Sequence, residues 1–338
     1  MGDVSDFQTW CDMKAVRPRR FVLDAEQRRQ RLEALWDLAQ PCRICGRACM
    51  ARRLDGQVGV CGVAHQVAVS WVGPHHGEEP PISGRRGSGT VFFLGCGLGC
   101  PYCQNYQISD STAAEASAHE SVEELAEQYL SLQERGCHNL NWVTPSHVVP
   151  MAVEALFLAD ERGFRLPVVY NSSAYDGLET LRLLDGIVDI YLPDFKYGPK
   201  ARLAELRAPS NLVDVSRAAL AEMYRQVGGL VLDESGVAVS GVLVRHLVLP
   251  GDMADSRGVL ELLAGVMDED LSLSLMSQYR PPRPGLRPPL DRGLAREEYE
   301  SVLEAVEDIS LRYGWMQELE AASIYFPDFS QANPFQSP

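Results

Sequence analysis

The sequence predicts an α/β protein: a parallel sheet with helical crossovers, either open or curved into a partial barrel, preceded by a small cysteine-rich module. Two observations lead to this prediction. From residue 90 onward, short β-branched apolar runs alternate with longer stretches of helical spacing. Seven of the nine cysteines fall in two tight groups, one before the first run and one directly after it. Repeated strand–helix–strand order gives parallel strands joined by right-handed crossovers.

Six strand and helix units are expected in the second part of the chain. The strands are predicted over residues 90–94, 140–144, 166–170, 187–192, 242–249 and 271–276. The helices are predicted over residues 121–135, 149–162, 178–184, 200–227, 254–268 and 295–313, the fourth with a turn near Pro209. Six units are too few for a closed eight-stranded barrel.

The predicted division of the chain has three parts: a module over residues 1–89, a partial barrel over 90–315 and a tail over 316–338. In the module, Asp24 can cap a helix that extends to residue 40. A short strand is predicted over residues 67–72, followed by a loop that extends to residue 89.

Composition and charge exclude several classes of protein. The chain has 31 Lys and Arg against 46 Asp and Glu, a formal net charge of −15, so we expect no nucleic-acid partner. Charged residues interrupt the most apolar stretch, 227–250, so no membrane span is expected. The first residues lack an apolar targeting segment, and we expect a cytoplasmic protein. In that setting the cysteines favour metal or catalytic thiols over disulfides.

The second cysteine group is the strongest chemical signal. Cys96, Cys100 and Cys103 lie on one short glycine-containing loop directly after the first predicted strand. A four-iron cluster held by three thiolates keeps one iron open to an outside ligand. Tyr102, beside the third thiolate, can stack on a purine. The alternatives are a zinc ion with a distant fourth ligand, which this spacing disfavours, and chance clustering.

These residues carry a resemblance to a known family. The pattern C-x3-C-x2-C after the first strand resembles the radical S-adenosylmethionine (AdoMet) superfamily, whose fold is a partial (β/α)6 barrel. The wider segments 87–93, 103–109, 245–251 and 277–279 resemble the branch of pyruvate formate-lyase-activating proteins, which are glycyl-radical-enzyme activases. With the N-terminal cysteines included, the resemblance covers about residues 40–330.

The resemblance implies a chemistry as well as a fold. A reduced [4Fe-4S] cluster on Cys96, Cys100 and Cys103 would cleave AdoMet to methionine and a 5′-deoxyadenosyl radical, which abstracts a substrate hydrogen. The first expected substrate is a protein backbone glycine, and the expected reductant is an electron donor such as flavodoxin or ferredoxin. Radical modification of another peptide or of a small metabolite is the alternative. An alternative of a different class is a non-catalytic iron-sulfur or zinc protein that binds a partner.

Polar residues follow five successive predicted strands, at the carboxyl ends where parallel α/β folds place their sites. The resemblance implies that Asp194, Lys196 and Arg245 help to hold AdoMet and that the segment starting at Thr144 passes beside its amino group. Asn171 belongs to the same expected set, although the activating enzymes carry an acidic residue there, so no bound alkali cation is assumed. A plain ion pair is the alternative for Asp194 with Lys196. Local loop hydrogen bonds are expected for Ser172, Ser173 and Ser277.

The remaining candidates have weaker signals. His147 and His246 are either proton donors or substrate contacts, or satisfied structural residues. The isolated Cys11 and Cys137 are predicted to be inert. Four side chains of metal-binding type precede the first strand and receive no role, because adjacent pairs rarely converge on one ion: His75, His76, Glu78 and Glu79.

The first cysteine group predicts a second metal site. Its four thiols can close a tetrahedral zinc site or saturate an auxiliary iron-sulfur cluster, and they are Cys42, Cys45, Cys49 and Cys61. Zinc would organise a module that has little core of its own, whereas a cluster could relay electrons toward the barrel. The spacing does not separate the two.

Overall fold

The computed structural model describes residues 17–110, 112, 119–319 and 326–335. Its main sheet contains five parallel strands in the order β2 (Ser88–Phe93), β3 (Leu140–Val143), β4 (Val168–Ser172), β5 (Ile190–Pro193) and β7 (Ala238–Val242). Two antiparallel strands flank them: β1 (Val69–His75) pairs with β2, and β6 (Val231–Leu232) pairs with β7. The parallel core of the sheet follows the chain order, as repeated right-handed crossovers require.

A second sheet continues the curve of the first. It contains the parallel strands β8 (Val244–Leu247), β9 (Ser272–Met276) and β10 (Tyr313–Met316). Only Leu243 separates β7 from β8, and Arg245 forms a bridge with Asp194 just after β5. The six expected parallel strands are therefore present. Their order is β2, β3, β4 and β5, then β7 continued by β8 as the fifth strand, and β9 as the sixth. This order is that of the predicted partial barrel.

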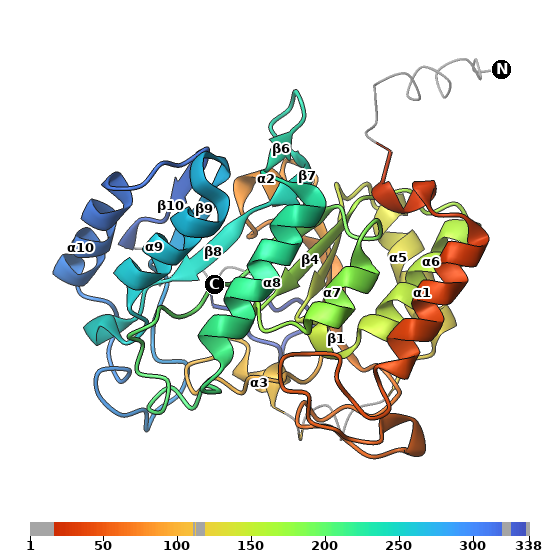
Figure 1. The fold of residues 1–338 in the computed structure, drawn as a ribbon, viewed down its shortest axis with the longest axis horizontal. Coiled ribbons are helices and arrows are strands. Elements are labelled where there is room, and N and C mark those ends of the chain that lie inside the picture. Colours follow the sequence, from red (N-terminus) through yellow and green to blue (C-terminus); the bar gives the residue numbers. More distant parts are fainter. Residues whose placement is uncertain (1–16, 111, 113–118, 320–325, 336–338) are drawn as a thin grey trace.

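Helices cover the outer face of the sheet (Figure 1). They are α1 (Ala25–Asp37), α5 (Val122–Glu134), α6 (Val149–Glu161), α7 (Leu178–Leu184), α8 (Leu212–Val227), α9 (Ser256–Met267) and α10 (Arg296–Glu307). Capping boxes at Asp24 and Ser121 start α1 and α5. Two single-turn helices lie at the barrel ends, α2 (Pro80–Ser83) and α3 (Tyr106–Ser109).

The interior of the barrel is apolar at one end and polar at the other. Val169, Ile190, Leu192 and Leu243 point into it and pack against Ile82 of α2. Because successive strand residues point to opposite faces, the next inward positions toward the carboxyl ends include Asn171 and Arg245. The apolar layer therefore closes one end, and the site must lie at the other.

Several predicted boundaries are wrong. The helix expected over 200–227 is confined to Leu212–Val227, and residues 200–211, which contain Pro209, form turns. The helix expected over 295–313 ends at Glu307. Tyr313, the last residue of the expected helix, instead begins β10, because the β-forming segment Tyr313–Met316 pairs with β9. The hairpin of β6 and β7, turning at Gly236 with a φ of 80°, was not predicted.

The segment expected as a loop over 73–89 contains the end of β1 and the helix α2. Since β1 shares a sheet with β2, the N-terminal part contributes directly to the barrel wall. The division of the chain into domains stays a prediction. Cys11 and part of the predicted tail lie outside the described residues. Within the described ranges, no helix combines the length and apolarity that crossing a bilayer requires.

Candidate functional site

The carboxyl ends of the strands enclose a cavity of about 1370 Å³. Figure 1 shows the cysteine-rich segment that follows α1, together with α3, at the edge of the molecule where these loops gather. All of the residues predicted to hold a cluster and AdoMet line this one cavity: Cys96, Cys100, Tyr102, Cys103, Thr144, Asn171, Asp194, Lys196 and Arg245. The fold thus brings together side chains from five different strand ends. Their individual roles stay predictions.

The loop of the cysteine triplet wraps the mouth of the cavity. Gly95 and Gly99 adopt φ angles of 83° and 66°, which side-chain-bearing residues rarely take. All described cysteines are free thiols. Burial raises the pKa of Cys103 to about 12 and also raises that of Cys100, which lies beside Lys196. Thiols of this kind are protonated when free and lose the proton to a bound metal.

The donor set fits a cluster by its chemistry. Among the described residues, no three His, Cys, Asp or Glu side chains are arranged so that they could hold a single metal ion. A four-iron cluster takes one thiolate on each of several irons, so its ligands lie farther apart than those of one ion. Three sulfurs on one glycine-rich loop, facing a roomy cavity, match that requirement.

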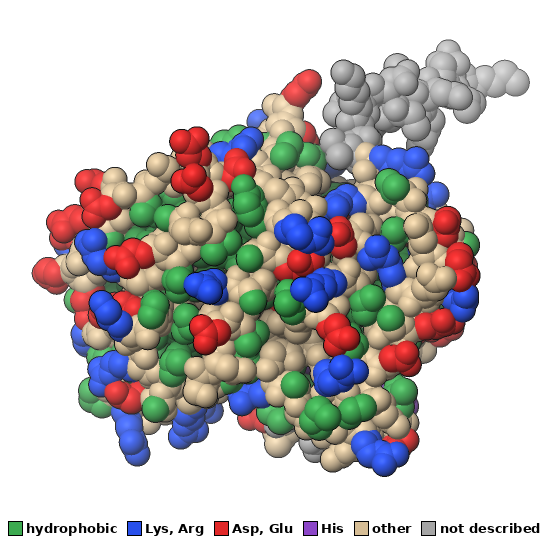
Figure 2. All heavy atoms as spheres, in the orientation of Figure 1, with side chains coloured by type: hydrophobic (Ala, Val, Ile, Leu, Met, Phe, Trp, Pro, Cys, Tyr) green, Lys and Arg blue, Asp and Glu red, His purple; other side chains and the backbone are tan. Residues whose placement is uncertain are grey.

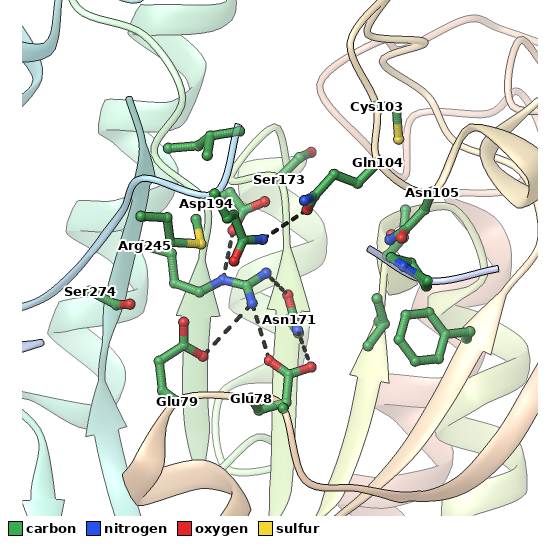
Figure 3. A pocket seen from close by; sticks show the side chains of 18 of the residues that line it. Glu78, Glu79, Cys103, Gln104, Asn105, Asn171, Ser173, Asp194, Arg245 and Ser274 are labelled. Atoms are coloured by element: carbon green, nitrogen blue, oxygen red, sulfur yellow. Dashed lines mark hydrogen bonds and ion pairs between the residues drawn. The ribbon is translucent and has the colours of Figure 1, made fainter. Parts of the chain in front are cut away.

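Arg245 stands at the centre of the polar end of the barrel (Figure 3). Its guanidinium donates from Nε to Asp194 Oδ1 at 2.7 Å, from Nη1 to Glu78 Oε2 at 3.1 Å and from Nη2 to Asn171 Oδ1 at 2.7 Å. Glu79 Oε2 lies 3.7 Å from Nη1. These carboxylates raise the pKa of Arg245 despite its burial. Arg245 is therefore held by internal acidic residues.

Asp194 also accepts a hydrogen bond from Lys196 Nζ at 2.8 Å. Burial opposes the charge on Asp194, but Arg245 and Lys196 outweigh it and hold the pKa of the carboxyl below its usual range. The pair is not a surface ion pair, because the two side chains are only 18% and 22% exposed. Lys196 also lies near the Cys100 thiol, so it joins the ion network to the cysteine loop.

Glu78 and Glu79 are functional candidates to which sequence reasoning gave no role. They follow β1, outside the predicted barrel, and reach into its interior beside Arg245 (Figure 3). Burial raises the pKa of both carboxyls, that of Glu79 to about 7, against the opposing effect of Arg245. The sequence signal was an acidic pair before a proline, but nothing in it indicated that β1 would turn the pair inward.

Thr144 carries backbone strain at the cavity. It has a φ of 56°, which is uncommon for a β-branched residue, and its amide donates to Asn171 O at 2.9 Å. This conformation turns the chain sharply from β3 into the 3-10 turn Pro145–His147. Strain of this kind concentrates at functional sites.

The two histidines are structural in their contacts. His147 Nε2 bonds to Leu94 O at 2.8 Å, and His246 bonds to Phe195 O and to Ser256 Oγ at 2.8 and 2.9 Å. Burial lowers the pKa of each imidazole to about 4. Both therefore stay neutral near pH 7 and hold loops in place.

Tyr102, Ser172 and Ser277 form hydrogen bonds within the protein. The Tyr102 hydroxyl lies 2.6 Å from that of Tyr197, and its ring packs edge-on against Tyr279. Ser172 Oγ donates to Asp176 Oδ2 at 2.6 Å, and Ser277 Oγ donates to Glu318 O at 2.7 Å. Loop hydrogen bonds were expected for these two serines. Ser173 lines the cavity.

The four N-terminal thiols lie close enough to influence one another, and they adjoin the cysteine triplet. Cys42 and Cys49 interact with each other, and Cys61 interacts electrostatically with both. Burial raises the pKa of Cys45 to about 12. A Cβ placed on Gly97 would lie 3.5 Å from Cys45 Sγ, so this thiol touches the triplet loop.

Arg47 fastens the two cysteine-bearing segments together. It donates from Nε to Gly97 O at 2.8 Å, and a small second cavity is lined by both Cys45 and Cys96. The four donors fit a metal site by their chemistry. No three of the described thiols are arranged to hold a single ion such as zinc, so the fit rests on the type of donor, which suits zinc and an iron-sulfur cluster alike.

The C-terminal segment, residues 326–335, lies along one side of the barrel and was not predicted there. The ring of Phe335 lies 3.9 Å from that of His75 and 5.3 Å from that of Phe92. Gln107 donates to Asp328 Oδ1 at 3.0 Å and accepts from the Phe329 amide at 2.9 Å. Because Phe335 also lines the cavity, this segment forms part of its wall.

Comparison with known proteins identifies a relative that matches most of the chain. No family model matches the chain. Uncharacterized protein MJ0674 of Methanocaldococcus jannaschii is 28% identical over 308 residues, which are 89% of this chain and 82% of that protein.

Two solved structures are also similar to the chain. They are native anSMEcpe with bound AdoMet and the same protein with AdoMet and a peptide, at TM-scores of 0.44 and 0.42 and identities of 13% and 11%. Each match covers 64% of this chain, and they cover 61% and 60% of the solved chains, less than two thirds of their length. Likeness at this level does not establish a shared family.

Proposed function

We propose that this protein is a radical AdoMet enzyme, with a [4Fe-4S] cluster on Cys96, Cys100 and Cys103 and AdoMet in the cavity beside it. The single observation that carries the proposal is that these three thiols share one cavity with the ion network of Asp194 and Lys196. The cavity offers a zwitterionic cofactor both positively and negatively charged side chains.

A cluster held by Cys96, Cys100 and Cys103 would supply the one-electron cleavage of a C–S bond of AdoMet, which would yield methionine and a radical able to abstract hydrogen. The chain's own residues bind AdoMet and orient it. Lys196, hydrogen-bonded to Asp194, offers its remaining N–H donors to a carboxylate. Asn171 and Thr144 add polar groups at neighbouring strand ends. The buried walls exclude water from the reacting atoms.

The cavity has room for a second molecule. Pockets that enclose one drug-sized ligand measure about 300–1,000 Å³. The volume here, about 1370 Å³, exceeds that range, so the cavity can hold AdoMet and a substrate together. The finer proposal is a glycyl-radical-enzyme activase, whose substrate is a backbone glycine.

One observation favours the alternative of a peptide or small metabolite as substrate. Residues 326–335 form part of the cavity wall through Phe335, so a folded protein can insert a loop there only if this segment moves.

For the N-terminal thiols we propose a second metal site. Its contact with the triplet loop through Cys45 would suit an electron-relaying cluster, and zinc is the alternative.

The test is anaerobic reconstitution with iron and sulfide, followed by reductant and AdoMet. The expected products are 5′-deoxyadenosine and methionine from the unaltered protein. Cys96→Ala, Cys100→Ala and Cys103→Ala should each abolish their formation, because too few ligands remain. Cys137→Ala is the matched control: this thiol is buried on the other side of β2, away from the cavity, and its loss should leave the products unchanged. Product formation by any of the three variants would refute the proposal.

A further inference from the structure

A pair of buried tyrosines lies against the cysteine triplet. The hydroxyl oxygens of Tyr102 and Tyr197 are 2.6 Å apart. Tyr197 is 0% exposed and Tyr102 is 5% exposed, whereas charged side chains of both signs meet water on the outer face of the molecule (Figure 2). Bulk water therefore does not compete for this hydrogen bond, and each hydroxyl finds its partners within the protein.

Tyr197 adjoins one thiol of the triplet. It interacts with Cys100, which packs against the buried cluster that contains both tyrosines. Among the described residues, Cys100 and Tyr102 line the cavity, and Tyr197 does not. Tyr197 can therefore influence an occupant of the cavity only through its neighbours.

The direction of the hydrogen bonds follows from the chemistry of the groups. Only one hydrogen can lie between two hydroxyl oxygens, so the other hydroxyl hydrogen of the pair points elsewhere. A metal-bound thiolate carries no proton and can only accept. Cys96 Sγ, for example, accepts from the Leu98 amide at 3.4 Å. With Cys100 bound to iron, Tyr102 donates to Tyr197, and the hydrogen of Tyr197 is left for the Cys100 sulfur.

We propose that the Tyr197 hydroxyl donates a hydrogen bond to the Cys100 thiolate and thereby raises the reduction potential of the cluster held by the triplet. The assignment rests on the proposed function, because it takes Cys100 as a cluster ligand. When a cluster accepts one electron, the negative charge on its sulfurs increases, and a donor that contacts one of them then binds more strongly. Tyr197 is thus a positioning residue, which acts through Cys100 and does not touch the reacting atoms.

The test is a redox titration of the reconstituted full-length protein without AdoMet, followed by electron paramagnetic resonance. The signal of the triplet is the one that Cys100→Ala removes. Tyr197→Phe, which deletes only the hydroxyl, should shift the reduction equilibrium about tenfold toward the oxidised cluster, which lowers the midpoint potential by about 59 mV. Tyr191→Phe is the matched control and should leave the potential unchanged, because its equally buried hydroxyl donates to an amide oxygen, Gln226 Oε1, at 2.7 Å.

A second variant tests the direction of the hydrogen bonds. Tyr102→Phe keeps the ring but removes the hydroxyl that polarises Tyr197, so it should shift the same equilibrium toward the oxidised cluster by a smaller factor, about twofold. If Tyr197 instead donated to Tyr102, this variant would free the Tyr197 hydrogen for Cys100 and would raise the midpoint potential. Tyr102→Phe also decides the matter if Tyr197→Phe assembles no cluster.

Three outcomes would overturn the proposal. They are a midpoint potential of Tyr197→Phe equal to that of the parent, an equal lowering in Tyr191→Phe, and an unchanged or higher midpoint potential in Tyr102→Phe. The titration needs neither AdoMet nor turnover. A lower midpoint potential in Tyr197→Phe, together with no 5′-deoxyadenosine from the parent, would contradict the proposed function and leave the hydrogen bond to Cys100 in place.

Discussion

Arg245 Nη1 and Glu78 Oε2 lie 3.1 Å apart although 167 residues separate them in the chain. The contact joins β8 to the segment that follows β1, and it does so inside the barrel. An arginine that could have been read as a free cofactor ligand is therefore the centre of an internal ion network. This changes what its substitution is expected to do.

Arg245→Leu should destabilise the fold. It leaves Glu78 buried without its cation and Asp194 with Lys196 as its remaining partner, and breaking a buried pair typically costs about 3–5 kcal/mol. Urea denaturation measures the loss. A stability within about 0.5 kcal/mol of the parent would show that these carboxylates do not depend on Arg245.

Lys196→Met should weaken AdoMet binding more than it destabilises the fold, unlike Arg245→Leu. Asp194 keeps Arg245 as a partner, so we expect most of the stability to remain. Loss of a charged hydrogen bond to AdoMet costs about 1.5–3 kcal/mol, roughly ten- to hundredfold in affinity. AdoMet titration of this variant beside its melting curve checks both parts. Unchanged affinity together with a large stability loss would make the Asp194–Lys196 pair purely structural.

Glu79 should make stability depend on pH. Its folded pKa is raised to about 7 by burial, so the folded protein binds this proton more tightly than the unfolded chain does. The contribution of Glu79 to the free energy of unfolding is full at low pH. It declines as pH rises toward the folded pKa, by up to about 1.4 kcal/mol per pH unit. The charged or titratable groups that face Glu79 are Arg245, Glu78 and His75, and burial lowers the pKa of His75 to about 4, below the pH range in which Glu79 titrates.

Glu79→Gln isolates that effect, because glutamine has no proton to lose. Denaturation curves of both proteins from about pH 5 to about pH 8 should show the variant gaining stability relative to the parent as pH rises. Parallel curves across this range would mean that Glu79 titrates normally in the folded protein.

Thr144→Gly should stabilise the protein slightly or leave it unchanged. The φ of 56° costs a β-branched residue about 1–3 kcal/mol, which glycine avoids, while glycine's greater freedom in the unfolded chain offsets about 1 kcal/mol. Replacing Thr90, a β-branched residue in regular β2, with glycine is the matched comparison and should destabilise. Equal losses at both positions would contradict the strain assigned to Thr144.

Phe335→Ala should loosen the cavity wall. The ring packs 5.1 Å from Trp71, so its removal should expose this indole to water. Iodide quenching of tryptophan fluorescence should increase, and the increase should vanish in a background carrying Trp71→Phe. Quenching identical to the parent would mean that residues 326–335 do not shield this side of the barrel in solution.

Much of the fold and the cavity could be predicted because the signals are local. The alternation of strands and helices set the order of the six parallel strands, and the polar residues after those strands converge because parallel strands end at one edge. Glu78, Glu79 and Phe335 could not be found this way. Their places depend on the antiparallel pairing of β1 and on ring packing of the C-terminal segment, which are contacts distant in sequence.

The central claim is that Cys96, Cys100 and Cys103 hold a cluster with one iron open to AdoMet. Electron paramagnetic resonance of the reconstituted, reduced protein tests it most directly, with and without AdoMet, in a background lacking the four N-terminal thiols so that only the cavity site contributes. We predict a cluster signal whose g-values change when AdoMet is added. A signal that AdoMet leaves unaltered, or no cluster signal while the fold is intact, would contradict the account.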